Sequence, residues 1–172
     1  MSSSFRKSST YIAQGEQAIG SNPEDIITTT LGSCVAVCLW DSVRMLGGMN
    51  HILLPDFGDW SRVNNFGGSA MDRLVNALLK EGADRRDMRA KVFGGAAMIA
   101  GLSDIGHRNA AFVRAYLKRE GIPCDAESTG GEMARQVKYW PHDGRARQRL
   151  VSGFEEPAPK PQQNVANDIE LF

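Results

Sequence analysis

The sequence predicts an α+β domain with many short strands and two main helices. Short runs rich in β-branched and other apolar residues recur along the chain, bounded by Gly, Pro or Asp. Two further stretches place apolar residues at helical spacing. At 172 residues, 42% of them hydrophobic, the chain is long enough for one domain with a sizeable core. We place this domain at residues 10–151, after a flexible polar arm at 1–9 and before a tail at 152–172.

Composition narrows the classes of function. The chain has 20 basic and 20 acidic residues, and a nucleic-acid-binding protein usually shows a basic surplus. No apolar run approaches the ~18–20 residues that span a bilayer. The N-terminus lacks the apolar segment of a signal peptide, so we expect a cytoplasmic protein without membrane insertion. Its three cysteines are an odd number, which favours free thiols over disulfides.

The first third of the chain predicts strands. We expect one strand in 11–19, and two more in 25–31 and 34–41, which Gly32 and Ser33 separate. A further strand at 45–54 stops before Pro55. The short connection at 41–44 indicates that it forms a hairpin with the strand before it.

A glycine- and asparagine-rich stretch at 56–69 shows no clear period and predicts a long functional loop. Helical spacing follows, closed by Gly82, and the apolar positions of this helix are Met71, Leu74, Val75, Leu78 and Leu79. The next strand, in 89–99, runs into a glycine turn. A second helix is closed by 121–123, and its apolar face consists of Phe112, Val113, Tyr116 and Leu117.

Short strands are expected at 124–129, 136–140 and 146–151, the last after an Asp-Gly turn. From residue 152 the composition changes to Pro, Gln, Glu and Asn, which is typical of disorder. Residues 153–172 hold four acidic residues and one lysine, so this tail is acidic. Its last five residues, DIELF, are either a short docking peptide or an end without function.

The stretch TTTLGSCVAVCLW (28–40) contains two cysteines of unequal position. On a helix, Cys34 and Cys38 would share a face and could bind one metal ion. On a strand their side chains stand about 13 Å apart, too far for one ion, so no metal is expected. Cys38 lies in mid-strand and is expected in the core. Cys34 begins the strand after a Gly-Ser turn, where a thiol can face a cleft, and is either a structural thiol or a nucleophile.

A cysteine nucleophile needs a base, because the thiolate is the reactive form. Of the three histidines, His142 lies in a predicted turn and His107 at a helix start. His51 lies on the strand expected to pair with the Cys34 strand, which favours it as the base. The glycine pairs at 94–95 and 130–131 do not extend to a phosphate-binding motif, and no cofactor is expected.

Five blocks of this sequence resemble the chemoreceptor glutamine deamidases of bacterial chemotaxis, the CheD family. They span nearly all of residues 10–151 and read TTTLGSCVAVCLWD (28–41), GGMNHILLPD (47–56), KVFGGAAM (91–98), IGHRNAAFVRAYL (105–117) and STGGEMAR (128–135). The family is similar to bacterial toxins that deamidate glutamine. The resemblance therefore implies a β-sandwich-like core of short, mostly antiparallel strands with helices packed against it. Ala134-Arg135 departs from the Gly-Arg pair expected after TGG.

The resemblance also implies a Cys-His-Thr triad. Its cysteine is Cys34, its histidine is His51, and its threonine, six residues before the cysteine, is Thr28; Thr29 and Thr30 adjoin that position. Cys34 would attack the glutamine amide to give a thioester, with His51 moving the protons. Backbone N–H groups at Ser33 and Cys34 are the candidates for the oxyanion hole.

The implied substrate is a glutamine on the cytoplasmic helical hairpin of a methyl-accepting chemotaxis receptor. Three aromatic residues of the expected loop, Phe57, Trp60 and Phe66, either dock that hairpin or anchor the loop to the core. Family members bind a CheC-type phosphatase, and the protein is expected at receptor arrays. An alternative is a non-catalytic module that tethers receptors or such a phosphatase.

Overall fold

The structure, a computed structural model, describes residues 8–54, 60–98 and 104–155. Its strands and helices, in chain order, are β1 (Ser9–Tyr11), β2 (Gln17–Gly20), β3 (Ile26–Leu31), β4 (Val35–Asp41), β5 (Leu46–Ile52), α1 (Trp60–Lys80), a 3-10 turn (Arg85–Asp87), β6 (Met88–Gly94), α2 (Asp104–Glu120), β7 (Cys124–Thr129), β8 (Ala134–Trp140) and β9 (Arg145–Val151). The expected arm and acidic tail lie almost entirely outside the described residues.

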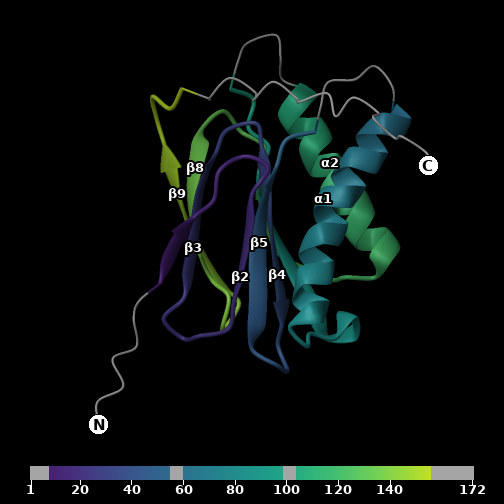
Figure 1. The fold of residues 1–172 in the computed structure, drawn as a ribbon. Coiled ribbons are helices and arrows are strands. Elements are labelled where there is room, and N and C mark those ends of the chain that lie inside the picture. The colour runs from purple at the N-terminus through teal and green to yellow at the C-terminus, as the bar shows by residue number, and fades with distance from the viewer. Residues whose placement is uncertain (1–7, 55–59, 99–103, 156–172) are drawn as a thin grey trace, which may run out of the picture.

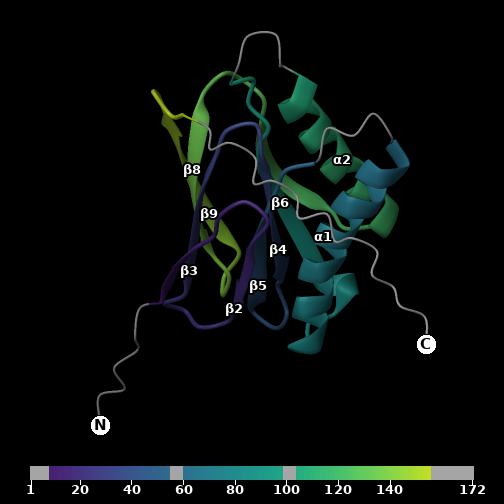
Figure 2. The same cartoon turned by 45° about the horizontal axis from the view of Figure 1, so that its top comes forward.

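The strands form two sheets that face each other. One has four strands in the order β1-β3-β8-β9, and the other has five in the order β2-β5-β4-β6-β7. Figure 1 shows the four-stranded sheet on one side, the five-stranded sheet in the middle and both helices on the outer face of the latter. The turned view in Figure 2 keeps these three layers. In the described strands, β1–β3 and β6–β7 pair in parallel and the other pairs are antiparallel. The α+β prediction, with a sandwich-like core of mostly antiparallel strands, is confirmed.

Alternation along β4 creates two core layers. Val35, Val37 and Leu39 pack toward the helices, while Ala36 and Cys38 face the four-stranded sheet. Successive strand side chains point to opposite faces, so one strand supplies both layers. Cys34, just before β4, belongs with Ala36 and Cys38 to the layer between the sheets. The layer between the sheets therefore contains both cysteines of this region, Cys34 and Cys38, among apolar core residues.

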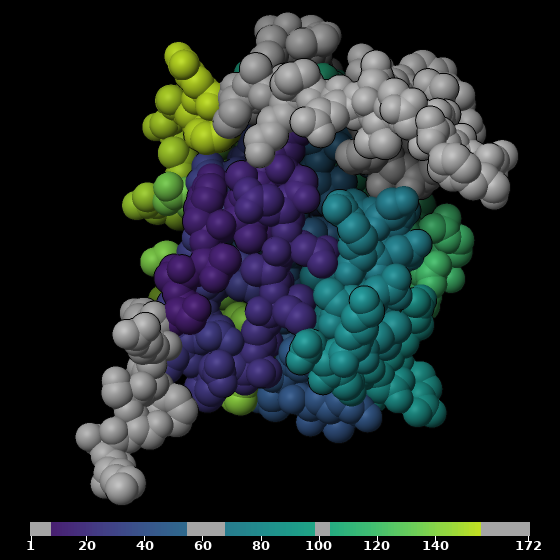
Figure 3. Space-filling view, in the orientation of Figure 1, coloured from purple at the N-terminus to yellow at the C-terminus, as the bar shows by residue number. Residues whose placement is uncertain are grey.

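The N-terminal region differs from the prediction of one strand in 11–19. Tyr11 ends β1 in the four-stranded sheet, and Gln17 begins β2 in the five-stranded sheet. Gly15, with φ +84°, lies in the turn between them, a conformation that favours glycine. Figure 3 shows this purple N-terminal region directly beside α1, in teal. There the Gln17 amide donates a hydrogen bond to the Arg73 carbonyl at 3.3 Å.

The predicted loop at 56–69 is wrong from Trp60 onward, because α1 begins there. Once an apolar stripe has nucleated a helix, each residue added to it gains a hydrogen bond. That gain outweighs the low helix propensity of the asparagines and glycines at its start. The other predicted strands and both helices are confirmed within a few residues, and α1 and α2 end before Gly82 and Gly121, whose φ angles are +102° and +68°.

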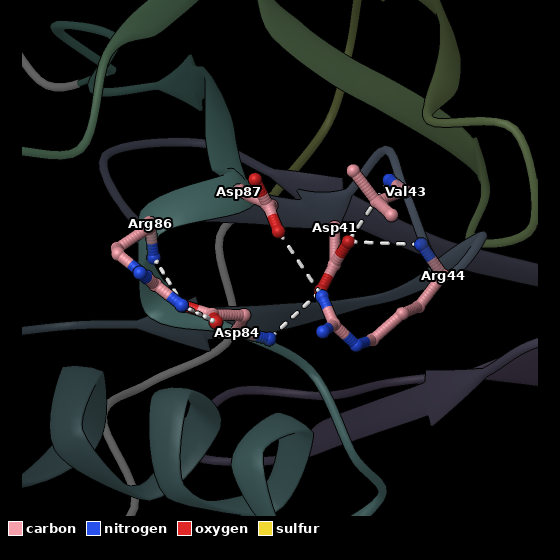
Figure 4. A network of polar contacts seen from close by, with 6 residues as sticks. All are labelled: Asp41, Val43, Arg44, Asp84, Arg86 and Asp87. Atoms are coloured by element: carbon pink, nitrogen blue, oxygen red, sulfur yellow. Dashed lines mark hydrogen bonds and ion pairs between the residues drawn. The ribbon is translucent and has the colours of Figure 1, made fainter.

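A network of polar contacts centred on Asp41 joins the β4–β5 hairpin to the 3-10 turn (Figure 4). The fully buried Asp41 carboxylate accepts hydrogen bonds from the backbone N–H groups of Val43, Arg44 and Asp84 at 2.8–3.0 Å, and from the Arg44 guanidinium at 3.2 Å. Burial by itself would raise the pKa of this carboxyl, but the hydrogen bonds outweigh burial and lower it. The hairpin turn is therefore held by an ionised, fully bonded carboxylate.

Asp41→Asn is expected to lower the free energy of unfolding by about 2–3 kcal/mol, because the amide supplies one acceptor oxygen and no charge. For a chain of this size the melting temperature should fall by roughly 4–12 °C. Asp143→Asn is the control, because Asp143 is exposed and bonds to neighbouring Arg145. Since the pKa of Asp41 is lowered on folding, its stabilisation is present at neutral pH and lost in acid, so the difference between wild type and variant should shrink as pH falls. Equal melting temperatures for the two variants at pH 7 would contradict this role.

Candidate active site

Cys34 lies in the tight connection between β3 and β4. Its carbonyl accepts a hydrogen bond from the Gly95 N–H at 2.8 Å, and the Gly32 carbonyl accepts one from the Ala96 N–H at 3.0 Å. Gly94 has φ +112°, and a Cβ atom there would collide with the Cys34 carbonyl. The segment Gly94–Ala96 therefore holds the backbone of Cys34 in place. Cys34 is 4% exposed, so its side chain is buried.

His51 lies on β5, the antiparallel neighbour of β4, as predicted. It pairs with Ala36, so Cys34, two residues before Ala36, is its diagonal neighbour on the same face of the sheet. Diagonal neighbours in antiparallel strands have Cα atoms roughly 7–8 Å apart, within reach of long side chains. His51 is itself buried, at 6% exposure. The fold thus places Cys34 and His51 on one face of the five-stranded sheet, toward the layer between the sheets.

The threonine that contacts His51 is Thr29 and not Thr28. Thr29 Oγ1 lies 2.8 Å from His51 Nδ1 and donates a hydrogen bond to the Ile12 carbonyl at 2.7 Å. The inward-facing residues of β3 are Ile27, Thr29 and Leu31, which are all buried. Thr28 and Thr30 alternate with them and face the outer side of the four-stranded sheet. The expectation that Thr28 holds the ring is therefore not met.

These contacts fix the tautomer of the imidazole. A threonine hydroxyl has one proton, and Thr29 directs it to the Ile12 carbonyl, which can only accept. His51 Nδ1 must then be the donor in its bond to Thr29 Oγ1. In the neutral ring this leaves Nε2 as the basic nitrogen.

Burial lowers the pKa of His51 to about 4, while the contact with the Ile12 carbonyl and the charge of Glu16 raise it by less. At neutral pH the ring is therefore uncharged. The lowered pKa favours the uncharged form of the His51 ring. Cys38 faces the same layer, but burial raises its pKa so far that it remains a thiol. Cys34 shares this face of the five-stranded sheet with His51.

The sequence reasoning missed Arg135, which enters the layer between the sheets from β8. It is 5% exposed and donates to the carbonyls of Gly94, at 3.3 Å, and Gly130, at 2.8 Å, and to Ser128 Oγ at 3.4 Å. Burial lowers its pKa, and in the described part of the chain no ion pair joins it to a carboxylate. The Gly130 N–H in turn donates to the Gly94 carbonyl at 3.0 Å. Arg135 therefore holds the two glycine turns together next to the cysteine.

A second missed residue is Asn109 of α2, whose amide contacts the backbone on either side of the site: the Ser33 carbonyl and the Leu54 N–H. Its only signal in the sequence was a polar residue on the buried face of an amphipathic helix.

Of the aromatic residues expected to dock a receptor, Phe57 lies outside the described residues. Trp60 and Phe66 fall within α1, but their side chains are not described. Their docking role stays a prediction.

Among the described residues, no three His, Cys, Asp or Glu side chains gather so that they could hold a metal ion. Cys34 and Cys38 stand four residues apart at the same face of one strand, too far to share an ion. Neither described helix is both long and apolar enough to cross a membrane.

Comparisons with known proteins identify the protein family. The family model for CheD, described as chemotactic sensory transduction, matches residues 53–150. A protein of Agrobacterium fabrum is 49% identical over 175 residues, covering 94% of this chain and 95% of its own. One of Caulobacter vibrioides is 46% identical over 172 residues, covering 94% and 92%. Both carry the name "Probable chemoreceptor glutamine deamidase CheD". The chain belongs to the CheD family.

A solved structure from Neisseria meningitidis, of the family DUF152, is also similar in part. It superposes with a TM-score of 0.49 at 14% sequence identity, covering 72% of this chain and 64% of its own.

Proposed function

We propose that the protein is a cysteine-dependent protein-glutamine deamidase that converts glutamine to glutamate and ammonia on methyl-accepting chemotaxis receptors. The relatives' names support the reaction and the class of substrate. The observation that carries the proposal is the 2.8 Å contact of Thr29 with His51, which holds a neutral imidazole beside the Cys34 strand.

In the proposed mechanism His51 Nε2 takes the proton of the Cys34 thiol as its sulfur attacks the glutamine Cδ. The protonated ring then gives its proton to the departing nitrogen, which leaves as ammonia, and a thioester remains. His51 next takes a proton from water, whose oxygen attacks the thioester carbon. Glutamate is released and the thiol is restored.

Thr29 has a positioning role in this mechanism. Its hydroxyl oxygen accepts the Nδ1–H and stabilises the charged ring in each proton transfer, as the third group of a triad does. Being neutral, it stabilises the imidazolium less than a carboxylate would. The backbone N–H groups of Ser33 and Cys34 are proposed to receive the charge that develops on the amide oxygen, where one lost donor costs ~2.7–4 kcal/mol.

Thr29→Val is expected to lower kcat about 10- to 150-fold, the value of one hydrogen bond to a group that becomes charged. Thr28→Val is the matched control, because it removes the same hydroxyl one residue away on the outer face, and it should retain near-normal kcat. Thr29→Ser keeps the hydroxyl and should restore most of the activity, which a purely structural role would not require. A larger loss for Thr28→Val than for Thr29→Val would transfer the role to Thr28. The measurement is steady-state ammonia release.

The proposed setting is the cytoplasm, where the protein acts at receptor arrays without metal or cofactor. A CheC-type phosphatase is the second proposed partner. If the protein were instead a non-catalytic tether for receptors or that phosphatase, Cys34→Ala would retain its signalling function.

The test of the function is incubation of the purified chain with receptor cytoplasmic fragments. Mass spectrometry should show conversion of particular glutamines to glutamate, with one ammonia released per site. Cys124→Ser is the control for unspecific thiol effects, because Cys124 is the exposed cysteine, and it should be fully active. Receptor fragments that stay unmodified under conditions in which they bind the protein would refute the proposal.

A further inference from the structure

Helix α2 packs against the segments that carry the candidate site. It lies on the outer face of the five-stranded sheet (Figure 2), where its contacts include β4 and β6. At Gly106 its backbone contacts the segment Gly94–Ala96, which bonds to the backbone around Cys34. A Cβ atom at Gly106 would lie 2.5 Å from the Gly95 carbonyl carbon and 2.6 Å from the Ala96 oxygen. The contact leaves no room for a side chain, so the helix is held directly against Gly94–Ala96.

One turn further along α2, Asn109 makes two hydrogen bonds to distant segments. Its Nδ2 donates to the Ser33 carbonyl at 2.8 Å, and its Oδ1 accepts from the Leu54 N–H at 3.0 Å. The side chain is 1% exposed, so both bonds form in a dry environment where an unmade bond is costly. Ser33 immediately precedes Cys34, and Leu54 follows His51 by three residues. A single amide therefore links the nucleophile's segment to the base's segment.

The bond to Ser33 also orients the peptide group that leads into Cys34. In a planar trans peptide the carbonyl and the N–H point in opposite directions, and the described residues contain no cis peptide. Because Asn109 draws the Ser33 carbonyl toward α2, the Cys34 N–H is directed away from α2. The Cys34 side chain faces the same way, toward the layer between the sheets.

We propose that Asn109 is a positioning residue for catalysis, which sets the separation and orientation of Cys34 and His51 by clamping Ser33 to Leu54. This inference rests on the proposed function and adds a residue to it. Misplacement of reacting groups by about 1 Å can cost on the order of 100-fold in rate. Loss of the clamp should therefore act on kcat and leave the binding of the receptor almost unchanged.

The decisive variant is Asn109→Asp, which keeps the shape and the oxygen that accepts from Leu54. It replaces the donor facing the Ser33 carbonyl with a second oxygen. We expect kcat for receptor deamidation to fall about 10- to 100-fold, with KM within about twofold of wild type. Asn109→Ala, which loses both bonds, should fall at least as far.

Val113→Ala is the matched control. Val113 lies one turn further along the same helix, is fully buried and packs in the helix-side core. Its truncation should lower the melting temperature and leave kcat within about twofold of wild type, which separates a loss of stability from a loss of alignment. If Asn109→Asp keeps the kcat of Val113→Ala, the proposal is overturned.

A second measurement needs no receptor and separates failure of this inference from failure of the proposed function. In a Cys124→Ser background, the iodoacetamide alkylation rate of Cys34 is compared with and without His51→Ala. The ratio of the two rates measures how well the imidazole activates the thiol. Asn109→Asp should reduce this ratio toward one, while Val113→Ala should leave it unchanged. An unchanged ratio in Asn109→Asp overturns the inference, whether or not the wild type deamidates receptors.

Discussion

Cys34→Ala is expected to reduce receptor deamidation about 10⁴-fold or more, to below detection, without unfolding the protein. The nucleophile and its base act as a unit, so removal of the sulfur removes the covalent route entirely. The substitution removes one sulfur atom from a buried site and adds no atom, so the fold should be retained. Mass spectrometry of receptor fragments after prolonged incubation is the measurement.

Cys38→Ala is the matched control for Cys34→Ala. It removes the same atom from the same inter-sheet layer, at a cysteine whose pKa burial raises so far that it does not ionise. It should lower the melting temperature and retain most of the activity. If Cys38→Ala were inactive and Cys34→Ala active, the nucleophile would be assigned to the wrong cysteine.

His51→Gln is expected to lower the deamidation rate about 10²–10⁴-fold, the usual contribution of general acid–base catalysis. The same residue predicts the pH profile of the wild type. Because burial lowers the pKa of His51 to about 4, the ring stays uncharged and able to accept a proton at pH values well below 6.5. The wild-type kcat/KM should therefore not decline near pH 6.5 and should fall only as pH approaches 4. A decline centred near pH 6.5 would contradict an uncharged, buried ring.

The lowered pKa of His51 also affects stability. Between pH 6.5 and about 4 the unfolded chain binds a proton that the folded chain does not, so the free energy of unfolding falls as pH falls through this window. For this one group the fall is about 3 kcal/mol at most. His51→Gln should remove it, so urea titrations at pH 7 and pH 4.5 would show a smaller difference for the variant than for wild type.

Much of the fold followed from local patterns. The short connection after Asp41 predicted the β4–β5 hairpin, and the apolar spacing that ends at Gly82 and Gly121 predicted both helices. The expected pairing of β4 with β5 was enough to place Cys34 and His51 on neighbouring strands. The start of α1 was missed because helix extension depends on cooperative hydrogen bonding and not on the propensity of each residue.

By itself the sequence predicted that Cys34 and His51 lie on neighbouring strands, because a hairpin is a local structure and strand alternation puts its diagonal neighbours on one face. Their proposed roles came from the resemblance to the CheD family. Only the tertiary structure decided which groups surround them. Three consecutive threonines carry no pattern that tells the inner face from the outer one, and the packing of one sheet on the other selected Thr29. Asn109 and Arg135 were hidden for the same reason. Each acts on backbone groups distant in sequence, and those contacts exist only once α2 and β8 have packed against the turns around Cys34.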